Sequence, residues 1–164
     1  MKNTSQISAS VGDQITAKRS AWDFSGDTPR SFVSHISRSV PLYAEGHDLV
    51  CRLSDFFIQP GSLGLELGVS TGELIAKLAQ YNGHKENVRW LGIDIEEAMI
   101  EEARRHCTGL ENVELLVDDI TTADFVQGLD FVVCYYTIQF LPPRLRQPLF
   151  DKIFASLNWG GALV

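Results

Sequence analysis

Three acidic residues in this sequence are spaced as a nucleoside site requires. Glu66, Asp94 and Asp119 each lie at the end of a short apolar run, and Asp94 comes 26 residues after Gly68. A carboxylate at that spacing can accept hydrogen bonds from both hydroxyls of a ribose. Asp119 is placed to accept a hydrogen bond from the exocyclic amino group of a base. The residues expected to supply apolar faces for the base follow the two aspartates directly: Ile95 and Ile120. Each acid alone is more typical of a loop or a helix cap, but the three together favour a nucleoside.

The stretch 63–74, LGLELGVSTGEL, reads as a buried strand, a tight turn and the start of a helix. Gly68 lets the backbone turn and approach a ligand, and Gly72 lets the helix begin close to the strand. However, Ser70 stands where a full dinucleotide fingerprint has a glycine, and the loop carries no lysine or arginine for a phosphate. A plain strand-to-helix connection explains the stretch equally well, so its value as evidence depends on the acids around it.

Strands and helices alternate along the rest of the chain. Apolar runs predict further strands at 88–93, 113–117 and 129–138, and a fifth strand begins at Ala162 after a turn at 158–161. Helical stripes lie between them, over 74–79, 95–107 and 143–157. This alternation predicts an α/β fold with a Rossmann-like, doubly wound parallel sheet. In such sheets the ligand lies beyond the carboxyl ends of the strands.

Three regions are expected along the chain. Residues 1–21 are polar and predict a disordered tail. Residues 22–58 predict a helical cap or lid with two amphipathic helices, and residues 59–164 form the ligand-binding domain. The apolar stripes of the two cap helices are Phe32, Val33, Ile36 and Val40, then Leu49, Val50, Leu53, Phe56 and Phe57.

The composition predicts a cytoplasmic protein with a small-molecule ligand. The formal net charge of −7 argues against a large nucleic-acid interface, and no apolar run is long enough to span a membrane. The three cysteines show no metal-ligand spacing, so no metal site is predicted. None of the four histidines lies at an expected strand end, so we interpret each as a surface residue.

Several motifs resemble those of a known family. The order ELGVSTG, GIDIEEAMI, DDI and YYTIQFL is similar to the class I S-adenosylmethionine-dependent methyltransferases. More narrowly, SRSVPLY at 37–43, QPG at 59–61, TIQFLPP at 137–143 and RQPLFDKI at 146–153 resemble the carboxy-S-adenosylmethionine synthases. The resemblance extends from Trp22 to Val164. It implies S-adenosylmethionine, or the related S-adenosylhomocysteine or carboxy-S-adenosylmethionine, as the cofactor.

The resemblance also implies roles for individual residues. Asp94 and Ile95 would hold the ribose and adenine, and Asp119 and Ile120 the adenine. The methionine part would contact Tyr43 and the loop after the first strand, whose candidate residues are Glu66, Gly68, Val69, Ser70 and Gly72. Tyr135 stands where the family has an asparagine that contacts the cofactor. No residue is assigned a catalytic role.

The reaction implied by the resemblance transfers a carboxyl group derived from prephenate onto the methyl group of S-adenosylmethionine, through a sulfonium ylide. Its product serves the modification of the wobble uridine of transfer RNA. The family's arginine that holds the product carboxylate lies beyond Val164, so we expect the C-terminal strands of the fold to be missing and synthase activity to be incomplete. We also expect the flank of the fourth strand to be exposed and to make the chain a homodimer, or a marginally stable monomer.

Alternative functions stay open at this point. An ordinary methyltransferase acting on a small molecule would use the same cofactor site, and a non-catalytic nucleoside-binding module would need no further residues. A dinucleotide dehydrogenase is least favoured, because the loop lacks a glycine and the chain lacks a catalytic His/Lys pair.

Overall fold

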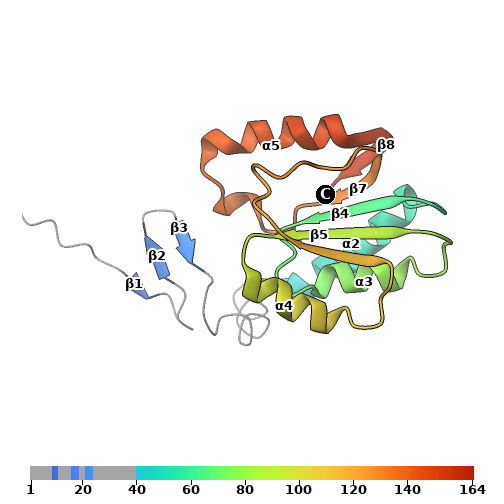
Figure 1. Cartoon of the computed structure of the whole chain (residues 1–164), viewed down its shortest axis with the longest axis horizontal. Helices are drawn as coiled ribbons and strands as arrows, with labels where there is room; N and C mark the ends of the chain where they lie inside the picture. The colour runs from blue at the N-terminus through green and yellow to red at the C-terminus, as the bar shows by residue number, and fades with distance from the viewer. Residues whose placement is uncertain (1–8, 11–15, 19–20, 24–39) are drawn as a thin grey trace, which may run out of the picture.

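The computed structural model describes residues 9–10, 16–18, 21–23 and 40–164 (Figure 1). Near the N-terminus, β1 (Ala9–Ser10), β2 (Thr16–Lys18) and β3 (Ala21–Asp23) pair as a small antiparallel sheet. β1, β2 and the first residue of β3 fall within residues 1–21, for which the sequence predicted a disordered tail. The other residues of that region lie outside the described ones. The first predicted cap helix, with Phe32, Val33 and Ile36, also lies outside the described residues.

A five-stranded parallel sheet forms the centre of the molecule, with strand order β6-β5-β4-β7-β8. Its strands are β4 (Leu63–Leu67), β5 (Arg89–Asp94), β6 (Val113–Val117), β7 (Leu129–Val133) and β8 (Leu157–Leu163). Helices α2 (Tyr43–Phe57), α3 (Glu73–Tyr81) and α4 (Glu97–His106) cover one face, and α5 (Pro143–Ser156) covers the other (Figure 1). The predicted doubly wound α/β fold is therefore confirmed, and the winding changes direction between β4 and β7.

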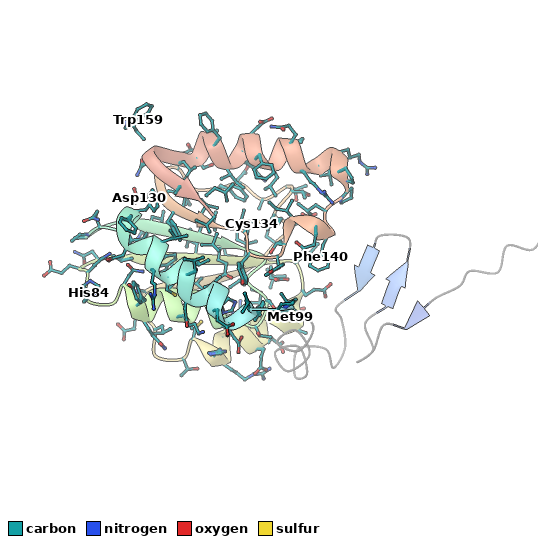
Figure 2. All side chains as sticks on the ribbon, turned by 180° about the vertical axis from the view of Figure 1, so that it is seen from behind. His84, Met99, Asp130, Cys134, Phe140 and Trp159 are labelled. Carbon is teal, nitrogen blue, oxygen red and sulfur yellow. The ribbon has the colours of Figure 1, made fainter. Side chains whose placement is uncertain are left out.

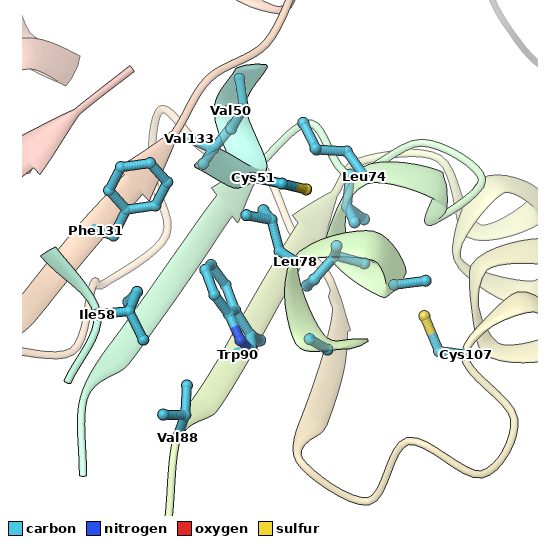
Figure 3. Close-up of a cluster of buried hydrophobic side chains, with 14 of the residues drawn as sticks. Val50, Cys51, Ile58, Leu74, Leu78, Val88, Trp90, Cys107, Phe131 and Val133 are labelled. Atoms are coloured by element: carbon cyan, nitrogen blue, oxygen red, sulfur yellow. The ribbon is translucent and has the colours of Figure 1, made fainter. Parts of the chain in front are cut away.

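Successive side chains of β4 point to opposite faces of the sheet, and each face carries an apolar core. Its three leucines, Leu63, Leu65 and Leu67, pack on the α5 side with Leu149 and Ile153 of that helix. Gly64 and Glu66 point the other way, where the core contains buried side chains of α2, α3, β5 and β7 (Figure 3). Both faces of the central strand are thus covered, so all five residues of β4 are buried.

Helix α3 buries the predicted face, whereas α2 is rotated from the predicted one. The four residues expected to face inwards from α3 are all buried: Leu74, Ile75, Leu78 and Ala79. In α2 the buried residues are His47, Val50, Cys51 and Ser54, while Leu49 and Phe56 are 57% and 79% exposed. The prediction that all four histidines lie at the surface is wrong for His47, which is 2% exposed. Helix α2 covers the sheet, and its role as a lid stays a prediction.

The end of the fourth strand and the start of the fifth differ from the prediction. β7 ends at Val133, five residues before Ile138, because the chain turns there and Tyr136 takes a left-handed conformation, with φ of 51°. β8 begins at Leu157, and its pairing with β7 passes from Leu129↔Leu157 to Phe131↔Ala162. The expected turn at 158–161 is therefore an irregularity inside the strand, where four residues lie opposite one of β7.

The predicted exposure of the β7 flank is wrong. Phe131, Val132 and Val133 are each 0% exposed, because β4 and β8 pair with both edges of β7 and helices cover its two faces. The argument for a homodimer from that flank no longer holds, and dimerisation stays a prediction. None of the helices in the described part of the chain has the length and the apolar run that crossing a membrane requires.

Candidate functional site

The loop after β4 is fixed to the neighbouring strand in a conformation that needs small residues. The amides of Gly68 and Val69 both donate to the carbonyl of Ile93, over 2.8 and 3.0 Å. Gly68, Ser70 and Gly72 have φ of 75°, 50° and 82°, so the chain passes three times through the left-handed region. A Cβ on Gly68 would collide with the side chain of Thr137. The loop thus brings its backbone against the segment that follows β7.

Asp94 at the end of β5 organises two loops. Its Oδ2 accepts a hydrogen bond from the amide of Ser70 over 2.8 Å, and its Oδ1 accepts one from the amide of Glu96 over 3.0 Å. Burial raises the pKa of this carboxyl, and the backbone amides around it partly offset that effect. Each carboxylate oxygen has a second lone pair, so Asp94 can still accept from a ligand. Ile95 beside it is 62% exposed.

Asp119 lies in a turn after β6. Its Oδ1 accepts hydrogen bonds from the amide of Thr121 over 2.8 Å and from the hydroxyl of Thr121 over 2.7 Å. Ile120 is only 6% exposed and packs in the core beneath α5. Ile95 and Ile120 were both predicted to supply an apolar face for the base. Ile95 is exposed and can pack against a base, whereas Ile120 has little exposed surface.

Glu66 is a buried acid with spare hydrogen-bonding capacity. Its side chain lies under the start of α3, where the amide of Ile75 donates to it, and the residue is 4% exposed. Burial raises the pKa of Glu66 well above its usual range, and the nearby Asp94 raises it further. Among the described residues, Oε2 of Glu66 has no hydrogen-bond partner. A buried acceptor of this kind suits a cationic or donating ligand group.

An aromatic cluster closes the site on the α2 side. The ring centre of Tyr43 lies 4.5 Å from that of His47 and 5.6 Å from that of Tyr135. The ring centres of Tyr135 and Tyr136 are 4.7 Å apart. The hydroxyl of Tyr135 donates to the carbonyl of Tyr43 over 3.2 Å, at a point where α2 carries Gly46 and has no side chain in the way. Burial raises the pKa of Tyr43, and Glu66 raises it further. The structure thus brings two of the predicted residues, Tyr43 and Tyr135, into contact.

Three residues of this region were not predicted. Thr137 donates to the carbonyl of Leu67 over 3.0 Å, and Tyr136 and His47 complete the aromatic cluster. The spacing of Tyr43 and His47, four residues apart on one helix, is a signal that could have paired them. In the described part of the chain, no group of three or more His, Cys, Asp and Glu residues could hold a metal ion.

His47 makes stability depend on pH. Burial is the main cause that lowers its pKa from 6.5 to about 4, and Lys77 lowers it further. Between these two values the unfolded chain binds a proton that the folded chain does not bind, so the free energy of unfolding should rise with pH across this window. The difference corresponds to roughly 3 kcal/mol. Urea denaturation at several pH values between 4 and 8 measures it.

The control for this prediction is the exposed His84, whose Nδ1 lies 3.2 Å from the carbonyl oxygen of Tyr81. His47→Leu should flatten the rise in stability between pH 4 and 6.5, and His84→Leu should leave it unchanged. Equal pH profiles for wild type and His47→Leu would contradict the assignment.

Comparisons with known proteins identify the family of this chain. The profile of the family described as "Methyltransferase domain" matches residues 65–161, which is more than half of the chain. A carboxy-S-adenosyl-L-methionine synthase of Shigella boydii is 36% identical over 151 residues, which cover 90% of this chain and 60% of that protein. This chain therefore spans about 60% of the length of the curated relatives it matches.

Solved structures show the same fold. A putative S-adenosyl-L-methionine-dependent methyltransferase of Methanococcus maripaludis has a TM-score of 0.68 at 18% identity, over 86% of this chain and 63% of that one. Coclaurine N-methyltransferase, bound to N-methylheliamine and S-adenosylhomocysteine, has a TM-score of 0.61 at 26% identity, over 73% of this chain and 34% of that one. Together with the family match, these likenesses show that the chain belongs to the methyltransferase-domain family, within the class I S-adenosylmethionine-dependent methyltransferases.

Proposed function

We propose that this chain binds S-adenosylmethionine and serves a transferase of the carboxy-S-adenosylmethionine synthase type. The observation that carries the cofactor assignment is the position of three carboxylates, Glu66, Asp94 and Asp119, at or just after the carboxyl ends of the adjacent strands β4, β5 and β6. The identity of 36% to curated synthases supports the choice of reaction over an ordinary methyl transfer.

The residues present fit such a cofactor. Asp94 would hold the ribose and Asp119 the adenine, with the exposed Ile95 against the ring. Glu66 has a buried oxygen without a partner among the described residues, which suits the ammonium group of the methionine part. Gly68, with φ of 75°, lets the loop turn tightly at this end of the sheet. When bound, the cofactor supplies a sulfonium group whose methyl carbon is activated.

The remaining residues of the site would line the methionine part. They are Tyr43, Val69, Ser70, Gly72 and Tyr135, whereas Ile120 would lie beside the adenine. By the resemblance to the synthases, Tyr135 would stand where they have an asparagine, and its hydroxyl donates to the carbonyl of Tyr43 in α2. On this assignment Tyr135 closes the site by joining the segment after β7 to the cap.

The second substrate would be a small organic acid such as prephenate, and the product would serve the wobble-uridine modification of transfer RNA in the cytoplasm. The net charge of −7 supports a small-molecule substrate over direct contact with nucleic acid. A homodimer is also part of this proposal.

Calorimetry tests the proposal directly. S-adenosylhomocysteine and S-adenosylmethionine should bind at least tenfold more tightly than NAD, since the site has three acids and its loop carries no basic residue for a pyrophosphate. Tighter binding of NAD would overturn the cofactor assignment. Mass spectrometry of a reaction with S-adenosylmethionine and prephenate then separates the two transferase types, because only the synthase type yields carboxy-S-adenosylmethionine.

A further inference from the structure

Lys152, in the middle of α5, makes contacts that the proposed function has not used. Its Nζ donates to the carbonyl of Ile120 over 2.9 Å and to the carbonyl of Ala123 over 2.7 Å. The same nitrogen lies 4.2 Å from the centre of the Phe125 ring. All three contacts are with one segment, the connection between β6 and β7, which begins with Asp118 and Asp119.

The carbonyls that Lys152 binds belong to buried residues. Ile120, Ala123 and Phe125 are 6%, 5% and 9% exposed. Buried carbonyl groups need donors, and a helical lysine supplies them here because this connection has no regular secondary structure of its own. On both sides of Lys152, α5 is anchored in the same core by Leu149 and Ile153, each 1% exposed. The ammonium group is therefore held on a rigid element.

The other side of the turn is closed by Asp119. Its backbone carbonyl accepts from the amides of Thr122 and Ala123 over 2.9 and 2.7 Å, and its side chain accepts from Thr121. The segment 119–123 is thus a compact turn with Asp119 on one side and Lys152 on the other.

Lys152 donates to carbonyls rather than to carboxylates. None of the ion pairs formed among the described residues includes it, although Asp118, Asp119 and Asp124 are close enough to act on its charge. The carboxylate of Asp119 consequently keeps acceptor capacity that a salt bridge would have used.

We propose that Lys152 is a positioning residue for recognition of the base: by binding the carbonyls of Ile120 and Ala123, it fixes the turn so that the carboxylate of Asp119 faces the exocyclic amino group of adenine. This inference rests on the proposed function, because it concerns the same cofactor site. Lys152 itself does not touch the ligand.

The test compares two ligands that differ at that amino group. S-adenosylhomocysteine carries it, and S-inosylhomocysteine has a carbonyl oxygen in its place. Calorimetry on the full chain should show that wild type prefers the adenosyl ligand by about tenfold, the value of one hydrogen bond to a charged acceptor. Lys152→Met, which keeps the apolar stem, should reduce this preference to less than about threefold.

Arg146 provides the matched control. It lies on the same helix and also donates to two backbone carbonyls, those of Leu141 over 3.0 Å and Gln139 over 3.3 Å, in the segment after β7. Arg146→Met should leave the preference for the adenosyl ligand unchanged. Lys152→Arg, which can donate to two acceptors at once, should restore most of the preference.

Two results would overturn the inference. One is a Lys152→Met variant that binds both ligands more weakly by the same factor, since that is the effect of a merely structural lysine. The other is a wild-type protein that binds S-adenosylhomocysteine without discriminating against the inosyl ligand, which would leave the proposed function standing. If Lys152→Met does not fold, Lys152→Leu, which also lacks a donor, is measured instead, and an unchanged preference for the adenosyl ligand in that variant overturns the inference equally.

Discussion

Replacement of Gly72 by alanine is expected to lower the free energy of unfolding by roughly 2–5 kcal/mol, a large part of the stability of a typical domain. Gly72 precedes α3 with φ of 82°, where an L side chain is strained. Its Cβ would lie 2.9 Å from Cβ and 3.0 Å from Cα of Ala103, inside α4. Because Cα of Ala103 belongs to a helix, relief of this contact requires α3 and α4 to separate. Urea denaturation measures the loss.

The control for Gly72 isolates the contact from the backbone strain. Gly109 has φ of 86°, and a Cβ there would meet no atom within 4 Å. Gly109→Ala carries the same strain and the same change in the unfolded chain, so it should cost only about 1–2 kcal/mol. Equal losses for the two variants would show that the approach of α3 to α4 is not tight.

Asp94→Ala is expected to weaken binding of S-adenosylhomocysteine by about ten- to a hundredfold, since a hydrogen bond to a charged acceptor contributes roughly 1.5–3 kcal/mol. The structure adds a second effect to the one predicted from the sequence. Asp94 also accepts from the amides of Ser70 and Glu96, so its loss should lower stability as well as affinity. Calorimetry and urea denaturation of the same sample measure the two effects.

Asp130→Ala is the control that distinguishes an effect on affinity from an effect on stability. It also accepts a backbone hydrogen bond, from the amide of Leu63 over 3.0 Å, and one from the side chain of Asn158 over 2.8 Å. Asp130 lies near the start of β7, at the opposite end of the sheet from the candidate site. Figure 2 shows this separation, with Asp130 at one end of the sheet and Met99 of α4 and Phe140, which follows β7, at the other. Asp130→Ala should therefore lower stability while affinity stays within about threefold of wild type. An Asp94→Ala protein that binds normally would show that the ribose assignment is wrong.

The sequence predicted the strand bounds well where an apolar run ends sharply at turn residues. β6 has the predicted bounds and β4 begins at the predicted residue, Leu63, because glycine, asparagine or aspartate marks the ends of these strands. β7 was predicted five residues too long, because the apolar run continues through Cys134 and Ile138 while the backbone already turns. The buried face of α2 was predicted only in part: Val50, Leu53 and Phe57 pack in the core, whereas Leu49 and Phe56 are exposed. Which side of the helix is buried depends on its packing against β7 and β8, and the local pattern does not encode that packing.

The site was predictable to the extent that strand ends share one edge. Asp94 and Asp119 could be placed together because parallel strands end on the same side of a sheet. Thr137 and Lys152 could not, because their partners Leu67 and Ile120 are 70 and 32 residues away in the chain. Such contacts depend on how the segments pack, and no local pattern encodes them.

The strand order β6-β5-β4-β7 also sets a length scale. Neighbouring strands are about 4.8 Å apart, so four adjacent strand ends form a row of roughly 14 Å. On the proposed assignment, this row places base recognition over β6, sugar recognition over β5, the sulfur over β4 and the transferred group beside β7. Nucleoside recognition and reaction chemistry then occupy opposite ends of one axis. Substitutions after β7, such as the tyrosine at position 135, could therefore change what is transferred in related chains while the nucleoside is read as before.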